Sequence, residues 1–232
     1  MKRVKSLVLL GMTAVIALLM GGCGASYQAR SMEIKELLLV NPGILEKGGD
    51  DQMLYRYEKP NVDIKKYTEV IIDPVLVSKN AELDAGDLEN YQKLANNAFV
   101  YLSQELEKDY KIVTTPGPDT LRIQMAIIDA DTSKPVRNLL SSIMPISMGV
   151  SLVKYGATGK QSGVGEISGE FKLTDAASGE LLGAGVDRRV GGKAAQGIWD
   201  TWYNADEALK FWAKKARFVL CVRRGATNCE NP

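Results

Sequence analysis

The chain of 232 residues contains no histidine. Histidine is the commonest general base and the commonest zinc ligand, so its absence removes Ser-His-Asp and Cys-His catalytic arrangements and the usual zinc sites. Neither sign of charge predominates, because 29 Lys and Arg residues face 28 Asp and Glu residues. This balance gives no reason to expect nucleic acid as a ligand. We therefore expect no enzyme, no catalytic residue, no metal site and no cofactor.

Two short motifs that resemble catalytic or nucleotide-binding signatures are incomplete. Gly159-Lys160 looks like the end of a phosphate-binding loop, but Lys154 stands where the first glycine is required and Gln161 replaces the Ser or Thr. Ser151 and Lys154 match the S-x-x-K pattern of serine acyl enzymes, but the companion S-D-N and K-T-G motifs are missing. The acids at expected strand ends and turns are explained by turn capping: Asp73, Asp129, Asp131 and Asp175.

The N-terminus has the charge and apolar pattern of a signal peptide. Residues 1–22 carry Lys2, Arg3 and Lys5 but no acid, and an apolar run of 14 residues follows over 7–20. This run is shorter than the roughly 20 residues that a bilayer-spanning helix needs. We therefore predict a signal peptide over residues 1–22.

The signal peptide ends in a sequence that resembles a lipobox. Leu19-Met20-Gly21-Gly22-Cys23 has the leucine, the small residues and the cysteine, and departs from the usual form at Met20. We expect cleavage before Cys23 and lipidation of that cysteine by diacylglycerol and a further acyl chain such as palmitate, since stable anchoring takes more than one chain. Gly24 in place of Asp favours the outer membrane, with the protein facing the periplasm. The alternatives are a secreted protein or an uncleaved anchor.

The mature chain would keep two of the three cysteines, Cys221 and Cys229. Thiols oxidise outside the cytoplasm, and Gly225 allows the intervening loop to turn back, so a disulfide is expected. Closing so short a loop contributes roughly 2–3 kcal/mol in the chain-entropy model. The alternative is a pair of free thiols near the terminus, while the spacing excludes a redox C-x-x-C motif.

Residue patterns divide the mature chain into a tether and one domain. Residues 23–65 show no sustained periodicity and contain Gly48-Gly49-Asp50-Asp51 and Pro60, so we predict a lipidated N-terminus followed by a tether. Residues 66–232 are predicted to form a single α/β domain. Its expected elements are a strand at 68–77 broken by Pro74, a helix at 87–108, strands at 110–113 and 121–127, a hairpin at 165–190 and a helix at 205–220 capped by Asn204.

The order strand, helix, two strands, hairpin, helix predicts an α+β fold. We expect a mixed sheet of about five strands with the two main helices packed on one face. In the first strand of the hairpin, Ile167, Gly169, Phe171 and Leu173 alternate with Glu166, Ser168, Glu170 and Lys172. Such alternation indicates one apolar face and one polar face.

Residues 139–153 form an uncharged stretch that Pro145 and Gly149 interrupt. It is too short to span a bilayer. One interpretation is a buried helix or loop that completes the core. The other is an exposed surface that contacts membrane or a partner protein. The apolar residues that would form this contact are Leu139, Leu140, Ile143, Met144, Ile146, Met148, Val150, Leu152 and Val153.

Several motifs of the mature chain resemble the bacterial lipoprotein family DUF3313. The motifs are Tyr55-Arg56-Tyr57, Asp73-Pro74-Val75, Leu173-Thr174-Asp175, Ser178-Gly179-Glu180-Leu181-Leu182 and Val186-Asp187-Arg188-Arg189. The stretch from Thr174 to Arg189 is the most specific. The resemblance implies an outer-membrane lipoprotein that faces the periplasm, and it brings no activity, ligand or catalytic residue.

The first functional hypothesis is a non-enzymatic binding or assembly protein, anchored through Cys23 to the outer membrane and associated with an envelope protein. The second is an accessory lipoprotein of a transport or secretion system that uses residues 139–153 to dock on membrane or partner. The third is an envelope enzyme without histidine. The basic residues of the C-terminal helix and tail, which include Lys210, Arg217 and Arg223, are expected on a solvated face or against anionic lipid head groups or cell-wall polymer. The sequence indicates no oligomeric state.

Overall fold

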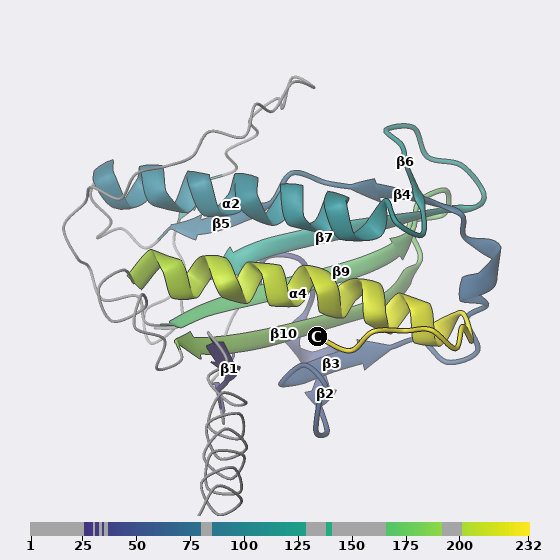
Figure 1. Ribbon diagram of the computed structural model, residues 1–232, viewed down its shortest axis with the longest axis horizontal. Coiled ribbons are helices and arrows are strands. Elements are labelled where there is room, and N and C mark those ends of the chain that lie inside the picture. Colours follow the sequence, from purple (N-terminus) through teal and green to yellow (C-terminus); the bar gives the residue numbers. More distant parts are fainter. Residues whose placement is uncertain are drawn as a thin grey trace, which may run out of the picture.

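The computed structural model describes residues 26–29, 31–32, 34, 37–79, 85–128, 138–140, 166–191 and 201–232. Its centre is a mixed β-sheet with the strand order β2-β3-β10-β9-β7-β4-β6, to which β1, β5 and β8 add at the sides (Figure 1). The strands are β1 (Ser26–Gln28), β2 (Glu46–Lys47), β3 (Tyr55–Glu58), β4 (Glu69–Ile72), β5 (Leu76–Lys79), β6 (Lys111–Ile112), β7 (Thr120–Ile128), β8 (Asn138–Leu140), β9 (Glu166–Asp175) and β10 (Leu181–Gly191). The helices are α2 (Ala85–Leu106) and α4 (Thr201–Arg223), with short 3-10 turns η1 (Pro42–Ile44) and η2 (Ile64–Lys66).

The long central strands follow the sequence pattern. β9 and β10 form the expected hairpin, and β7 pairs antiparallel with β9 over its whole length. β4 and β5 lie on either side of Pro74, and both pair parallel with β7. Proline cannot donate to a strand ladder, so the break at this residue is expected. The mixed sheet of the predicted α+β fold is confirmed.

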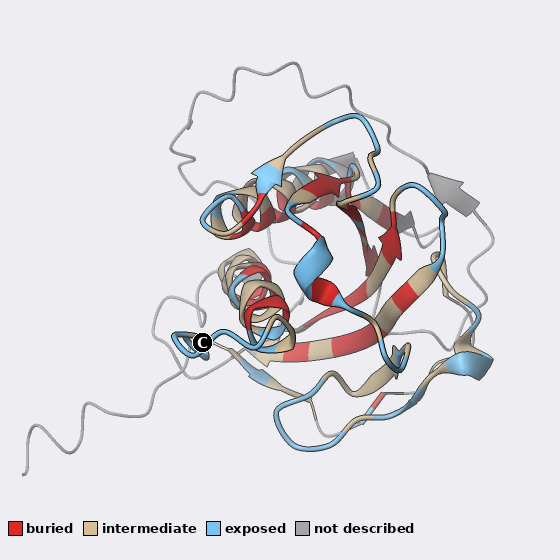
Figure 2. Ribbon diagram, turned by 90° about the vertical axis from the view of Figure 1, so that its right-hand side faces the viewer, coloured by how far each residue is buried: buried red, intermediate tan, exposed pale blue. Residues whose placement is uncertain are grey.

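Both helices cover the same face of this sheet. Figure 2 looks along α2 and α4 and shows them side by side on one side of the curved sheet. Their buried stripes, which include Leu94, Leu102 and Leu209, form one cluster with Leu121 and Ile123 of β7. The order and placement of the helices agree with the prediction. α4 begins at Thr201, however, so Asn204 lies within the helix and does not cap it.

The number of strands was predicted too low. Ten strands occur among the described residues, where about five were expected. The strand expected at 110–113 is present as β6, and the one expected at 68–77 is divided into β4 and β5. The additional strands β1, β2, β3 and β8 have two to four residues each. A run of this length is too short to show alternation, so its pairing is decided by tertiary contacts.

The expectation that residues 23–65 form a tether was wrong for their described part. β1, β2 and β3 belong to the sheet, and they pair with β10 or with one another. Residues 37–45, which we call the strap, lie over the sheet face opposite the helices. There the strap residues Leu37, Leu38, Leu39 and Leu45 pack with Met32, Ala126, Ile128 and Val186. The folded sheet therefore includes residues well before position 66.

None of the described helices is sufficiently long and apolar to cross a membrane.

Candidate functional site

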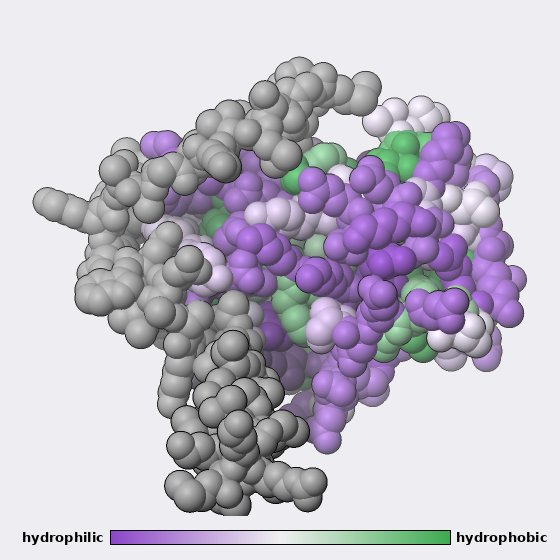
Figure 3. All heavy atoms as spheres, in the orientation of Figure 1, coloured by the Kyte–Doolittle hydropathy of each residue, from purple (hydrophilic) through white to green (hydrophobic). Residues whose placement is uncertain are grey.

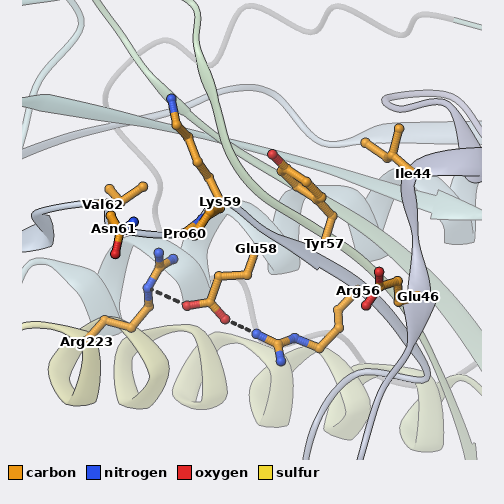
Figure 4. A pocket seen from close by; sticks show the side chains of 10 residues that line it. All are labelled: Ile44, Glu46, Arg56, Tyr57, Glu58, Lys59, Pro60, Asn61, Val62 and Arg223. Carbon is orange, nitrogen blue, oxygen red and sulfur yellow. Dashed lines mark hydrogen bonds and ion pairs between the residues drawn. The ribbon is translucent and has the colours of Figure 1, made fainter.

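A groove of about 590 Å³ lies between β3 and the C-terminal end of α4 (Figure 4). Polar and charged side chains predominate among its described lining residues: Ile44, Glu46, Arg56, Tyr57, Glu58, Lys59, Pro60, Asn61, Val62 and Arg223. A volume of this size is in the range of small-molecule sites, although such sites are usually more apolar. The lining favours a polar or charged ligand.

The groove exists because β3 is only partly covered on its outer side. β2 pairs with β3 at Tyr55 and Arg56 alone, since the chain before β2 turns through η1. On its inner side, β3 pairs with β10 over its full length. After β3 the chain turns at Asn61, whose φ of 57° is tolerated by asparagine better than by most residues. The second half of β3 is therefore left beside open space.

The Glu58 carboxylate lies between two guanidinium groups in this groove. Its Oε1 is 3.1 Å from Nε of Arg223, and its Oε2 pairs with Nη2 of Arg56. Figure 4 shows Glu58 bridging a residue of α4 and a residue of its own strand. Burial, and then the charge of Arg56, lowers the pKa of Arg223. Two cations share one anion here, so the cluster can accept a further anionic oxygen.

The groove is lined by side chains that can form ion pairs and hydrogen bonds. Among its described lining residues there is no serine, threonine or cysteine that could act as a nucleophile. Over the described part of the chain, no three His, Cys, Asp or Glu residues are grouped so that they could hold a metal ion. Lys59 pairs with Glu180 and is therefore not held inside the Arg56–Glu58–Arg223 cluster. The arrangement can bind through ion pairs and hydrogen bonds.

The expected disulfide between Cys221 and Cys229 is present. It joins the end of α4 to the C-terminal tail, which folds back so that Lys215 Nζ donates to Asn231 Oδ1 at 2.8 Å. A second hollow of about 400 Å³ lies around this disulfide. It shares no described lining residue with the groove.

The basic residues of α4 are largely paired with acids of the same chain. Arg217 Nε lies 2.7 Å from Asp109 Oδ2, and Lys210 Nζ lies 2.9 Å from Asp206 Oδ2. The helix-covered side of the molecule is hydrophilic over most of its surface (Figure 3). This side of the molecule therefore carries basic residues that form ion pairs within the chain.

Of the residues that the sequence singled out, Arg223 lines the groove, whereas Cys221, Cys229, Leu139 and Leu140 do not. Cys23 lies outside the described residues, but Ser26, three residues later, begins β1. Leu139 and Leu140 belong to β8, which pairs antiparallel with β5. The remaining apolar candidates lie outside the described residues: Ile143, Met144, Ile146, Met148, Val150, Leu152 and Val153.

The groove residues were missed because no local pattern identifies them. Arg56 and Glu58 alternate with Tyr55 and Tyr57, which is a signal for a strand but not for a site. Arg223 is 165 positions from Glu58 in sequence, and only the packing of α4 beside β3 brings them together.

Comparison with known families identifies the chain. The model of the family described as "Protein of unknown function (DUF3313)" matches residues 37–216, and the chain belongs to this family. The resemblance found in the sequence motifs is thereby confirmed. No curated protein matches the chain in sequence.

Solved structures show distant similarity. PelC from Paraburkholderia phytofirmans, solved as a dodecamer, is 9% identical with a TM-score of 0.36, over 75% of this chain and 96% of that chain. A DUF4136 family protein from Bacteroides thetaiotaomicron is 13% identical with a TM-score of 0.39, over 73% and 95%. A protein from Caulobacter crescentus, described provisionally as a lipoprotein, is 11% identical with a TM-score of 0.33, over 71% and 95%.

Proposed function

We propose that this protein is a lipid-anchored, non-enzymatic binding protein of the cell envelope. It is held through Cys23 at the periplasmic face of the outer membrane, and it binds an envelope partner in the groove between β3 and α4. The observation that carries the proposal is the placement of the two sites along β10. β1, which follows Cys23, pairs with residues 189–191, whereas the groove lies beside Gly183, the partner of Glu58.

This placement separates the anchor from the groove by most of the length of a strand. From Gly183 to Gly191 there are eight residues, which at about 3.3 Å per residue span roughly 26 Å. A groove at that distance is accessible to a partner while the anchor is in the bilayer. The lipobox-like sequence and Gly24 support the outer membrane as the location.

The chemistry of the groove supports binding. Its Arg56–Glu58–Arg223 cluster presents donors and one acceptor, and charge-assisted hydrogen bonds to such groups are the stronger ones. A partner that offers a carboxylate or phosphate together with an apolar group would use both the arginines and Ile44. This ligand class requires no catalytic residue.

Site-specific crosslinking in intact envelopes tests the proposal. A photo-reactive phenylalanine replaces Tyr57 in the groove or, as the matched control, Tyr27 in β1. We expect one discrete protein adduct from position 57 and its absence from position 27. Arg223→Gln should lower the yield at position 57 roughly tenfold, because a hydrogen bond to a charged group is worth about 1.5–3 kcal/mol. Equal adducts at both positions, or a yield insensitive to Arg223, would contradict a groove partner.

The anchor is tested separately with Cys23→Ala. This variant should move from the membrane fraction to the soluble fraction, because it removes the site of lipidation. Continued membrane attachment would mean that another segment or a partner holds the protein.

A second candidate is the accessory role in which residues 139–153 dock on membrane or partner. One observation favours it: β9, which follows this stretch, begins with Glu166 opposite Val190, and Val190 is opposite Tyr27 of β1. The chain that follows this stretch therefore enters β9 at the end of the sheet where β1 lies. Replacing residues 141–153 by a Gly/Ser linker should leave a stable domain that loses its partner. An unfolded domain would instead show that the stretch is core.

A further inference from the structure

We propose that the domain rests against the lipid surface with one corner of its sheet, formed by β1 and the C-terminal end of β10, and does not swing on a tether. The inference rests on the proposed function, since it requires lipid on Cys23. Its partner is the head-group layer of the membrane that holds the anchor.

The first argument is the length of the connection. Three residue steps separate Cys23 from Ser26, the first residue of β1. An extended chain spans at most about 3.6 Å per residue, so the link reaches about 10 Å. A lipidated Cys23 therefore brings β1 to within the thickness of the head-group region.

The second argument is the direction of β1. It runs antiparallel to β10, with Ser26 opposite Gly191 and Gln28 opposite Arg189. Followed backwards from Ser26, the chain therefore leaves the sheet beyond the last residue of β10. The short link to Cys23 therefore starts at this corner of the sheet.

The third argument is that side chains hold β1 in place. Arg189 donates from Nε to Ser26 Oγ at 3.0 Å and from Nη2 to Ser26 O at 2.8 Å. Gln28 Nε2 donates to Asp187 Oδ1, which belongs to the same carboxylate that accepts from Trp212 Nε1 at 2.7 Å. Asp187 and Arg189 are both buried. β1 is thus tied through β10 to α4, and separating it would remove hydrogen bonds from the buried charges of Arg189 and Asp187.

The fourth argument is the exposed aromatic residue on β1. Tyr27 is 59% exposed, more than any other large hydrophobic residue in the described part of the chain. Tyrosine is enriched at the level of lipid head groups, where its ring and hydroxyl contact apolar and polar groups together. Tyr27 lies four residues after Cys23, so its ring is within reach of the head groups around the anchor.

The test measures lipid labelling at three positions of the full-length, lipidated protein in its own membrane. A photo-reactive phenylalanine replaces Tyr27, Val190 or Val222. Tyr27 reports that the anchor is in lipid, whether or not the domain is docked. Val190 is half-buried on β10 opposite Tyr27, and it reports contact of the folded corner. Val222 is an exposed valine at the groove end of α4 and serves as the matched control.

We expect lipid adducts at positions 27 and 190. Labelling at 190 should be at least about fivefold above labelling at 222, which lies at the groove end of the molecule. Roughly 23 Å of strand separates Val190 from Gly183 beside the groove. A linker of about 20 Gly and Ser residues inserted between Ala25 and Ser26 has a mean span of about 25 Å and should reduce this difference to about twofold or less. The linker variant should stay in the membrane fraction.

Each other result has a distinct meaning. Loss of lipid labelling at position 27 would overturn the lipid anchor and with it the proposed function. Labelling at 27 with equal labelling at 190 and 222 would keep the anchor and overturn the docked corner. A difference that the inserted linker leaves unchanged would also overturn it, because docking would then not depend on the short link. If the variant at Val190 does not fold, Arg188 on the same strand and face takes its place.

Discussion

The two faces of the sheet are covered in different ways. On one face, α2 and α4 bury a continuous apolar cluster that includes Tyr67, Leu102, Leu121 and Trp212. On the other face, the strap buries a small cluster around Met32, Ala126, Ile128 and Val186. Since apolar burial contributes stability in proportion to area, the helix-covered face should contribute far more of it.

Strand β9 also places one buried carboxylate on each face of the sheet, Asp175 toward the helices and Glu170 toward the strap. Their surroundings shift the pKa of the two carboxylates in opposite directions. Asp175 accepts hydrogen bonds from Ser178 N at 2.9 Å, Tyr67 Oη at 2.8 Å and Lys66 Nζ at 3.1 Å. These bonds, the Ser178 N–H first, hold its pKa well below the ordinary range. The ion pair and the hydroxyl therefore make the charged form of Asp175 the stable one.

Glu170 faces the strap and, among the described residues, accepts hydrogen bonds from backbone N–H groups. Leu38 N donates to Oε2 at 2.7 Å, and Leu39 N and Val40 N donate to Oε1 at 2.7 and 2.9 Å. Burial raises the pKa of Glu170 in spite of these bonds. The strap is thus fastened by one carboxylate that is costly to bury, whereas the helices are fastened by packing. This contrast leads to three predictions, in order of decreasing effect.

The largest effect is expected from Trp212→Ala on the helix-covered face. Trp212 is buried, packs edge-on against Phe171 with ring centroids 5.3 Å apart, and donates to Asp187. Removing it should lower the free energy of unfolding by about 4 kcal/mol. Trp212→Phe keeps most of the packing and should cost only about 1–2 kcal/mol through the lost hydrogen bond to Asp187. Urea unfolding measures both, and a loss below about 1 kcal/mol for the alanine variant would contradict this account.

The helix-covered face was predictable because its elements are long enough to show a period. α2 carries Leu94, Ala98 and Leu102 at helical spacing, and β7 alternates between buried and more exposed residues from Leu121 to Met125. The turn residue Asp175 was also correctly assigned to capping. Local pattern is sufficient where one face of an element is buried and the other is solvated.

The strap face was not predictable, because its burial depends on contacts between residues far apart in the sequence. In the sequence, Glu170 belongs to the polar side of an alternating strand and would be assigned to solvent. It is fully buried because residues 130 to 132 positions earlier fold over it. The groove depends on a similar long-range approach, of Arg223 to Glu58. No periodicity in either segment contains this information.

An intermediate effect is expected from Glu170→Gln on the strap face. The amide keeps the size of the side chain but turns an NH₂ group toward backbone donors, so we expect a loss of about 2 kcal/mol. Amide hydrogen exchange should accelerate at Leu38, Leu39 and Val40 more than in α2 or α4. Glu180→Gln makes the same chemical change at an exposed position and should stay within about 0.5 kcal/mol. Uniform acceleration across the helices would show that the strap is not a separate unit.

The smallest effect is expected from Asp175→Asn, which should cost about 1.5 kcal/mol at neutral pH because the hydrogen bond from Tyr67 and the ion pair with Lys66 are weakened. Its pH dependence sharpens the contrast with Glu170. The pKa of Asp175 is lowered from 3.8, so its contribution is fully present above that pH and is lost as the pH falls through the folded value. The gap between wild type and Asp175→Asn should therefore narrow below about pH 4.

For Glu170 the sign is reversed. Its pKa is raised from 4.5, so the folded state holds its proton more tightly, and stability is lost as the pH rises from 4.5 through the folded value. The gap between wild type and Glu170→Gln should therefore be widest below pH 4.5 and narrow above it. Urea unfolding of wild type and both variants from pH 3 to pH 8 measures the two slopes. If the difference in unfolding free energy between wild type and variant changed with pH in the same direction for both carboxylates, the contrast between the two faces would be wrong.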